Sequence, residues 1–199
     1  MSIPDQSAFD FVTEQPRRPK KPERLFLGFF AEKHAQPAIR RIGEQAKNES
    51  SLSGKLLADD RFHTSLCHLS DRRRVRSKDE YAADLAAKTV RIPSFEITYS
   101  RMGSFLGAPR KGQSPKHPLV LFADDGPVNE LYATLGAELR KFRFRVPESF
   151  RPHLTLSYNR QFLPMRAVDP VTFVVREFVL VHSELWLTEY HVLKTWHLH

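Results

Sequence analysis

Two segments of the chain share one pattern: histidine, a variable residue, a hydroxyl residue and leucine, at residues 63–66 (HTSL) and 153–156 (HLTL). Each segment is typical of a short β-strand, in which residues two apart point to the same face. A strand of this kind places its leucines in a core and presents an imidazole and a hydroxyl together on the other side. The chain must therefore fold so that both strands have one buried and one open face.

The elements around these segments are also repeated. The apolar run at residues 25–30 (LFLGFF) predicts a buried strand, and Pro37 fits the first turn of a following helix. The second copy begins near residue 118 with PLVLFAD, and Asp125 and Pro127 predict the start of its helix. The order strand, helix, histidine strand occurs twice, which indicates a diverged duplication.

Further segments complete an α+β chain rich in antiparallel strands. Ser77 and Glu80 have capping-box spacing, which predicts a helix through about Ala87. SFEITYS, VTFVVREFVLVHS and ELWLTEYHVLKTWHL predict the remaining strands. The helix after Pro127 should bury one face, made of Val128, Leu131, Leu135, Leu139 and Phe142.

A chain of 199 residues can build one domain or two small packed lobes. The hydrophobic fraction of 41% and the charged fraction of 27% are typical of a globular protein, and exclude a fibrous or largely disordered one. We expect a flexible leader at residues 1–23, which combine prolines with basic residues, and a single bilobal domain at residues 24–199. No apolar run is long enough for a signal peptide or a membrane span.

Charge and cysteine content restrict the surroundings of the protein. The formal charge is +8 and the sequence pI is near 9.8, which favours contact with polyanions such as nucleic acid. Cys67 is the only cysteine, so an intramolecular disulfide and a multi-cysteine metal site are excluded. We expect a cytoplasmic monomer with no membrane partner.

If the two lobes face each other, two imidazoles and two hydroxyls meet across a cleft. Cleavage of a phosphodiester needs a base for the attacking oxygen, an acid for the leaving oxygen, and donors for the non-bridging oxygens. Histidines titrate near neutrality and suit the first two tasks. Hydroxyl groups suit the third.

The two histidine segments resemble the paired signatures of the 2H phosphoesterases. The nearest branch is the bacterial RNA 2′,3′-cyclic phosphodiesterases, also called 2′-5′ RNA ligases. RLFLGFF at residues 24–30, the phrase FRPH that ends at His153, and FVLVHSELW at residues 178–186 extend the similarity. It covers the chain from about residue 24 to the C-terminus.

The resemblance implies a bilobal α+β fold, with antiparallel sheets and flanking helices around a central cleft. It also implies an enzyme that acts without metal or other cofactor. It implies that His63 is the general acid for the 3′-oxygen and His153 the general base for water. Ser65 and Thr155 would bind the phosphate. The product would be a 2′-phosphate, and attack by a 5′-hydroxyl in place of water would make a 2′-5′ linkage.

The chain departs from the family pattern beside each signature. Residues 67–70 are CHLS where relatives often have Phe-Leu-Gly, and Tyr158 stands where many relatives have arginine. Strand alternation predicts that Cys67 shares the face of His63 and that His68 faces away. It also places Tyr158 on the leucine-bearing face, outside the cleft.

Two rival functions remain open at this stage. The first rival is the same hydrolysis with a small cyclic nucleotide as the substrate in place of an RNA end. Specificity constants for the two substrates would distinguish them. Alternatively, the chain is a non-catalytic module that binds RNA or nucleotides. The arginines at positions 72, 73, 74 and 76 either draw RNA towards the site or form a solvated loop. His191, His197 and His199 are expected to lie on a C-terminal strand and not to bind zinc.

Overall fold

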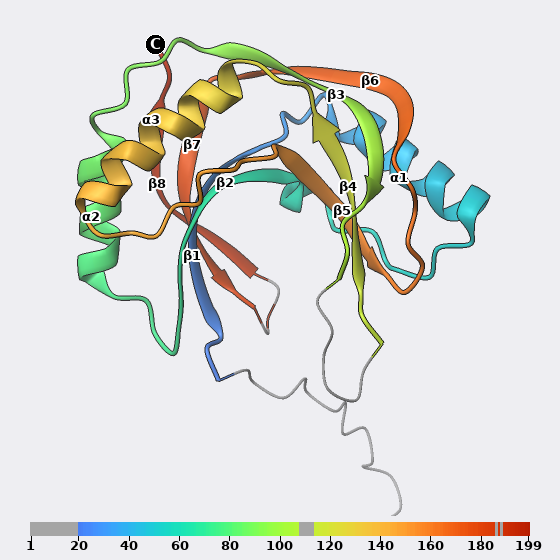
Figure 1. Ribbon diagram of the computed structural model, residues 1–199, viewed down its shortest axis with the longest axis horizontal. Coiled ribbons are helices and arrows are strands. Elements are labelled where there is room, and N and C mark those ends of the chain that lie inside the picture. Colours follow the sequence, from blue (N-terminus) through green and yellow to red (C-terminus); the bar gives the residue numbers. More distant parts are fainter. Residues whose placement is uncertain (1–19, 108–113, 186, 188) are drawn as a thin grey trace, which may run out of the picture.

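The computed structural model describes residues 20–107, 114–185, 187 and 189–199 (Figure 1). Residues 1–19 of the predicted leader lie outside the described residues, as do residues 108–113 of the Gly/Pro/Lys-rich connection. The first described strand begins at Glu23. The division into leader and domain stays a prediction.

The described strands form one antiparallel sheet in the order β6-β3-β4-β5-β2-β1-β7-β8. Its strands are β1 (Glu23–Phe30), β2 (His63–Arg72), β3 (Phe95–Ser104), β4 (His117–Ala123), β5 (His153–Asn159), β6 (Arg166–Val175), β7 (Glu177–Glu184) and β8 (Glu189–His197). Three α-helices accompany them in the described chain: α1 (Gln36–Ser50), α2 (Ser77–Ala87) and α3 (Pro127–Lys141). The predicted α+β class with antiparallel pairing is confirmed.

The sheet consists of two equivalent halves. One half contains β2, β1, β7 and β8, and the other contains β5, β4, β3 and β6. Each half carries one copy of the predicted order: β1, α1 and β2 in the first, and β4, α3 and β5 in the second. At the centre, β2 and β5 pair only through Thr64 and Leu154, so the two histidine strands lie next to each other and then separate.

The helices begin and bury their faces much as predicted. Pro37 lies in the first turn of α1, and the predicted residues Val128, Leu131, Leu135 and Leu139 are buried on α3. Helix α1 follows β1 but packs on β5 and β6 of the other half, whereas α2 and α3 pack against each other (Figure 1). Buried apolar residues of these helices and of the strands form one hydrophobic core.

Two details of the helix predictions are wrong. Ser77 is the first helical residue, and Arg76 is the N-cap without a side-chain capping bond, so the capping box does not form. Phe142 lies just beyond the last residue of α3 and is 39% exposed, because the chain leaves the helical path before its side chain reaches the core.

A buried hydrogen bond joins the two halves beneath the cleft. The hydroxyl of Tyr99 on β3 lies 2.6 Å from Oγ1 of Thr64 on β2, and both residues are fully buried. These strands are separated in the sheet by β4 and β5, so the sheet must curl strongly for the bond to form. The ring of Tyr99 also stacks on Phe173, with 5.8 Å between the ring centroids.

No helix in the described part of the chain has both the length and the apolar character needed to cross a membrane.

We expect Tyr99→Phe to lower the free energy of unfolding by about 1–3 kcal/mol, because it leaves the Thr64 hydroxyl in the core without its partner. Urea denaturation measures the loss. The double variant Tyr99→Phe/Thr64→Val removes both hydroxyls and should lose less than the sum of the two single variants. A Tyr99→Phe protein as stable as the wild type would contradict the role of this bond.

Candidate active site

A cleft of about 290 Å³ opens where β2 and β5 separate. His63, Ser65, His153 and Thr155 all line it. The structure therefore brings together the four side chains that the sequence singled out. They come from equivalent positions on the two central strands, because the predicted repeat is built into the two halves of the sheet.

The two histidine rings are held in the same way. Nδ1 of His63 lies 2.8 Å from the carbonyl oxygen of Arg61, and Nδ1 of His153 lies 2.7 Å from that of Arg151. A carbonyl oxygen only accepts hydrogen bonds, so each Nδ1 carries a proton and donates it. This selects the tautomer in which Nε2 of each neutral ring keeps its lone pair for chemistry in the cleft.

Both imidazoles are weak bases in this environment. Burial lowers the pKa of His63 to about 4, and the positive charge of Arg61 adds to the effect. Burial also lowers the pKa of His153, again with a contribution from the neighbouring Arg151. Both rings are therefore neutral at pH 7 in the empty cleft, and a bound anion would favour their protonation.

Aromatic rings surround the histidines. His63 contacts Phe26 and Tyr190, with ring centroids 5.1 and 5.3 Å away. His153 meets the ring of Phe105 edge to face, with 4.8 Å between centroids. Phe105 also packs on Phe122. These contacts restrict rotation of the imidazoles and keep water from one side of each ring.

An extra residue interrupts β2 directly after Ser65. Leu27 and Gly28 are consecutive on β1, but their partners on β2 are Cys67 and Ser65, so Leu66 has no partner. This is a β-bulge, which reverses the side-chain alternation beyond it. Gly28 permits the close approach here, because a Cβ at this position would lie 2.5 Å from a backbone carbonyl oxygen of β2.

The bulge overturns two predictions about β2. Cys67 does not share the face of His63: it is 2% exposed and belongs to the core. His68 does not face away from the cleft, but lines it. Burial also raises the pKa of the Cys67 thiol to about 12, so a cysteine thiolate plays no part in this cleft.

The same irregularity occurs on β5 and overturns the prediction for Tyr158. Leu119 and Val120 are consecutive on β4, but they pair with Ser157 and Thr155. Beyond this bulge Tyr158 turns into the cleft and is 51% exposed. The first six residues of β2 and β5 consequently have the same order of buried and open positions, so His68 and Tyr158 are equivalent residues of the two halves.

Arginines beside the cleft were not anticipated. Arg61 and Arg24 both line it, and the guanidinium of Arg61 lies over the ring of Tyr190, 4.3 Å from its centroid. A signal for Arg61 exists in the sequence, since an arginine stands two residues before each histidine, at positions 61 and 151. Nothing in the sequence pattern indicates Arg24.

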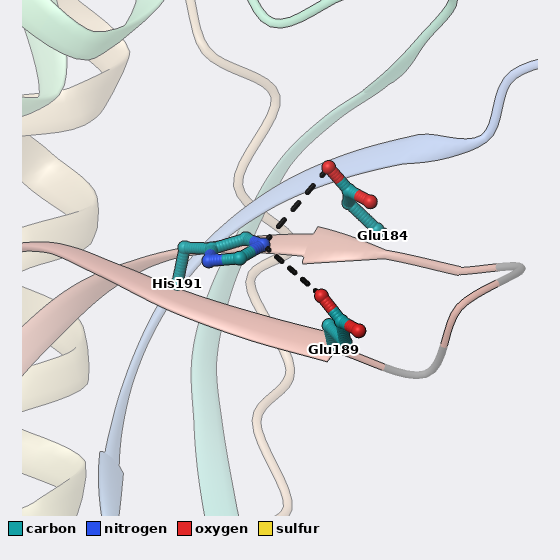
Figure 2. A group of neighbouring side chains, drawn as sticks. All are labelled: Glu184, Glu189 and His191. Atoms are coloured by element: carbon teal, nitrogen blue, oxygen red, sulfur yellow. Dashed lines mark ion pairs between the residues drawn. The ribbon is translucent and has the colours of Figure 1, made fainter.

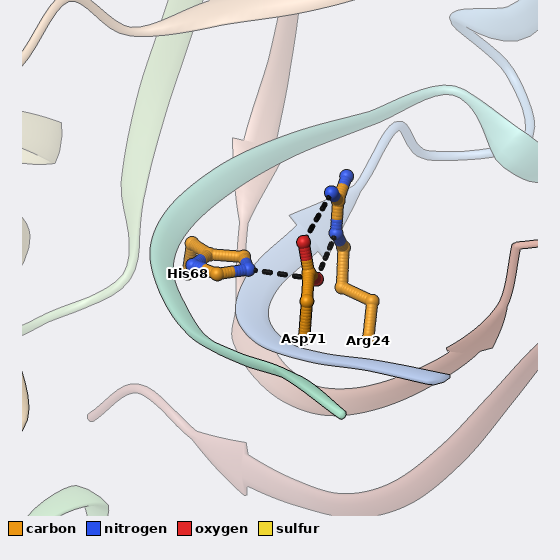
Figure 3. Close-up of polar contacts among 3 residues, drawn as sticks. All are labelled: Arg24, His68 and Asp71. Atoms are coloured by element: carbon orange, nitrogen blue, oxygen red, sulfur yellow. Dashed lines mark hydrogen bonds and ion pairs between the residues drawn. The ribbon is translucent and has the colours of Figure 1, made fainter. Parts of the chain in front are cut away.

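Arg24 and His68 are held by one carboxylate (Figure 3). The guanidinium of Arg24 donates to both oxygens of Asp71, over 2.8 and 3.0 Å, and Nε2 of His68 lies 2.9 Å from Oδ1. The bond from Arg24 lowers the pKa of Asp71 to about 2, with a smaller contribution from His68. This network forms one end of the cleft.

A second polar group lies on the outer face of the β7–β8 hairpin (Figure 2). Nε2 of His191 lies 3.9 Å from Glu184 and 3.8 Å from Glu189. Among the described residues this is the one cluster of three side chains whose ligand atoms are close enough for a metal ion. Its residues alternate with Tyr190, which lines the cleft, so the cluster points away from the candidate site.

Known structures resemble this chain over most of its length. The protein TT0787 of Thermus thermophilus is 21% identical, with a TM-score of 0.67, and the match covers 88% of this chain and 97% of that one. E. coli LigT in complex with 3′-AMP is 25% identical, with a TM-score of 0.66 and coverage of 89% and 98%. A protein described as a phosphoesterase is 23% identical, with a TM-score of 0.66 and coverage of 89% and 99%. These matches show the fold.

No protein-family model matches the sequence, and no curated protein is significantly similar to it.

Because the bulge places Cys67 in the core and not in the cleft, the reactivity of its thiol tests the position of the bulge. We expect an aromatic disulfide reagent to leave the native protein unmodified and to label one thiol per chain in denaturant, because the core excludes the reagent. The release of the coloured thiolate measures this. Rapid labelling of the folded protein would show that Cys67 faces the cleft and that the bulge is wrongly placed.

Proposed function

We propose that this chain, which has the fold of the 2H phosphoesterases, hydrolyses 2′,3′-cyclic phosphate ends of RNA to 2′-phosphates with two histidines and no metal ion. The observation that carries the proposal is the matched pair of imidazoles. His63 and His153 lie on the two strands that meet at the cleft, and each is oriented by the carbonyl two residues before it. A hydroxyl residue stands beside each ring.

The surroundings of the histidines favour an anionic substrate. Nε of Arg61 is buried and has no hydrogen-bond partner among the described residues. Arg24 adds a second guanidinium to the lining of the cleft. Phosphate oxygens are strong acceptors for such donors. The known structures of E. coli LigT include complexes with phosphate, 3′-AMP, NADP⁺ and ATP, which supports a nucleotide or RNA phosphate as the ligand of this chain.

In the proposed reaction, water attacks the phosphorus while Nε2 of His153 accepts a proton from it. The bond between phosphorus and the 3′-oxygen breaks, and Nε2 of His63 gives its proton to that oxygen. Ser65 and Thr155 donate hydrogen bonds to the non-bridging oxygens as their charge changes. The assignment of acid and base follows the family resemblance. Because the pKa of His63 is low in the empty cleft, the bound phosphodiester anion would hold its proton in place.

The cleft volume gives the small-nucleotide alternative a specific basis. About 290 Å³ lies near the lower end of the range for small-molecule sites, which suits one nucleotide better than a longer segment. A cyclic mononucleotide would meet the same histidines and hydroxyls as an RNA end. Specificity constants for the two substrates decide between them.

The central test is incubation of the protein with RNA that ends in a 2′,3′-cyclic phosphate, in the presence of EDTA. We expect turnover to a 2′-phosphate, and a loss of about 10²–10⁴-fold in kcat for His63→Ala and for His153→Ala, the usual contribution of a general acid or base. His191→Ala is the matched control, because this histidine lies on the outer face of β8 and should leave kcat unchanged. A wild-type protein without turnover, or full activity in both cleft variants, would refute the proposal.

The dependence of kcat/KM on pH should show an acidic optimum. The productive form of the free enzyme has His63 protonated and His153 neutral. Since burial lowers the pKa of His63 to about 4 and that of His153 below its usual 6.5, this form is most abundant between the two pKa values. Above pH 6.5 kcat/KM should fall about tenfold per pH unit as His63 loses its proton. A rate that rises between pH 6.5 and pH 8 would be incompatible with these roles.

A further inference from the structure

A second, strongly basic hollow adjoins the cleft at the end of β2. It is formed by the turn that follows β2 and by the segment that precedes β1. Besides Asp71 and Val75, its lining consists of basic residues: Lys20, Lys21, Arg72, Arg73, Arg74 and Arg76. We call this surface the basic hollow.

Little of this charge is neutralised within the protein. Arg72 donates to Asp79 over 2.7 Å, and the one acid of the lining, Asp71, is bonded to Arg24. Arg73 and Arg74 are exposed and have no acidic partner in the part of the chain that the structure describes. Clustered like charges repel one another, so the hollow is suited to bind an anion from outside.

Asp71 connects the basic hollow with the cleft through its bonds to Arg24 and His68, which Figure 3 shows. Asp71 is one of the residues that line the hollow, while its partners Arg24 and His68 line the cleft. Strand β2 runs for ten residues from His63 to Arg72. At about 3.3 Å per residue this corresponds to roughly 30 Å between the histidines and the arginines. A single nucleotide at His63 does not reach the hollow, but a strand of several nucleotides does.

We propose that the basic hollow is a second binding site, which takes the phosphodiester backbone of a single-stranded RNA whose end lies in the cleft. The proposal rests on the proposed function and narrows its substrate to an oligonucleotide. A chain of phosphates covalently continuous with the reacting one would pass Arg24 and His68 and then meet Arg73 and Arg74. The small cleft admits the end of one strand, which disfavours a base-paired end.

The test compares two substrates, a cyclic mononucleotide and an eight-nucleotide RNA with a 2′,3′-cyclic phosphate end. For Arg73→Ala/Arg74→Ala we expect the ratio of kcat/KM, oligonucleotide over mononucleotide, to fall about tenfold at low salt. The slope of log kcat/KM against log salt for the oligonucleotide should become shallower by about 1.4, since each lost contact with single-stranded phosphate removes about 0.7. The matched control Arg41→Ala/Arg145→Ala removes the same amount of positive charge outside the cleft and the basic hollow. It should keep the wild-type ratio.

Binding of a fluorescently labelled RNA that ends in a 2′-phosphate separates this proposal from the proposed function. One outcome is that the wild type turns over neither substrate, but Arg73→Ala/Arg74→Ala binds the RNA about tenfold more weakly than the control pair. This outcome would support the basic hollow as an RNA-binding site and refute the proposed hydrolytic function. If both pairs of variants keep the wild-type ratio and the wild-type affinity, the hollow is not an RNA site, whatever the protein hydrolyses.

Discussion

The single pairing of Thr64 with Leu154 at the centre of the sheet determines the architecture of the candidate site. A longer pairing of β2 with β5 would close the space between the strands. A complete separation would place the histidines on unrelated lobes. The buried bond between Thr64 and Tyr99 keeps this narrow junction in place from below. The two halves therefore form one sheet, and the cleft that both imidazoles line opens where β2 and β5 separate.

Burial and positive charge act together on the chemistry of this opening. Each histidine is packed among aromatic rings and lies near an arginine, and both influences lower its pKa. The cost of protonating the rings in the empty cleft is offset only when an anion enters it. Arg24, Arg61 and His68 make the same cleft attractive to phosphate. Both rings are therefore neutral in the free enzyme, whereas one ring can hold a proton in the complex.

The sequence predicted much of the fold because its patterns are local. The apolar runs, the prolines at the helix starts and the alternating strands each depend on neighbouring residues, and the order of elements was correct in both halves. The errors about β2 and β5 occurred where one residue interrupts a pattern. Leu66 and Leu156 continue a perfect alternation of residue types, but neither has a partner on the adjacent strand, so Cys67, His68 and Tyr158 lie opposite to the predicted faces. The register of β2 depends on its partner strand β1 and on Gly28 within that strand. The residues of β2 alone therefore cannot predict it.

By itself, the sequence determined that two equivalent strands each present an imidazole beside a hydroxyl, since a two-residue period suffices for that. The tertiary structure alone decided what surrounds this pair. It turned His68 and Tyr158 inward through two bulges, and it brought Arg24, 47 residues before its partner Asp71, to the end of the cleft. Such contacts depend on curling of the sheet and on register between distant strands. They are properties of the folded chain and not of any short segment within it.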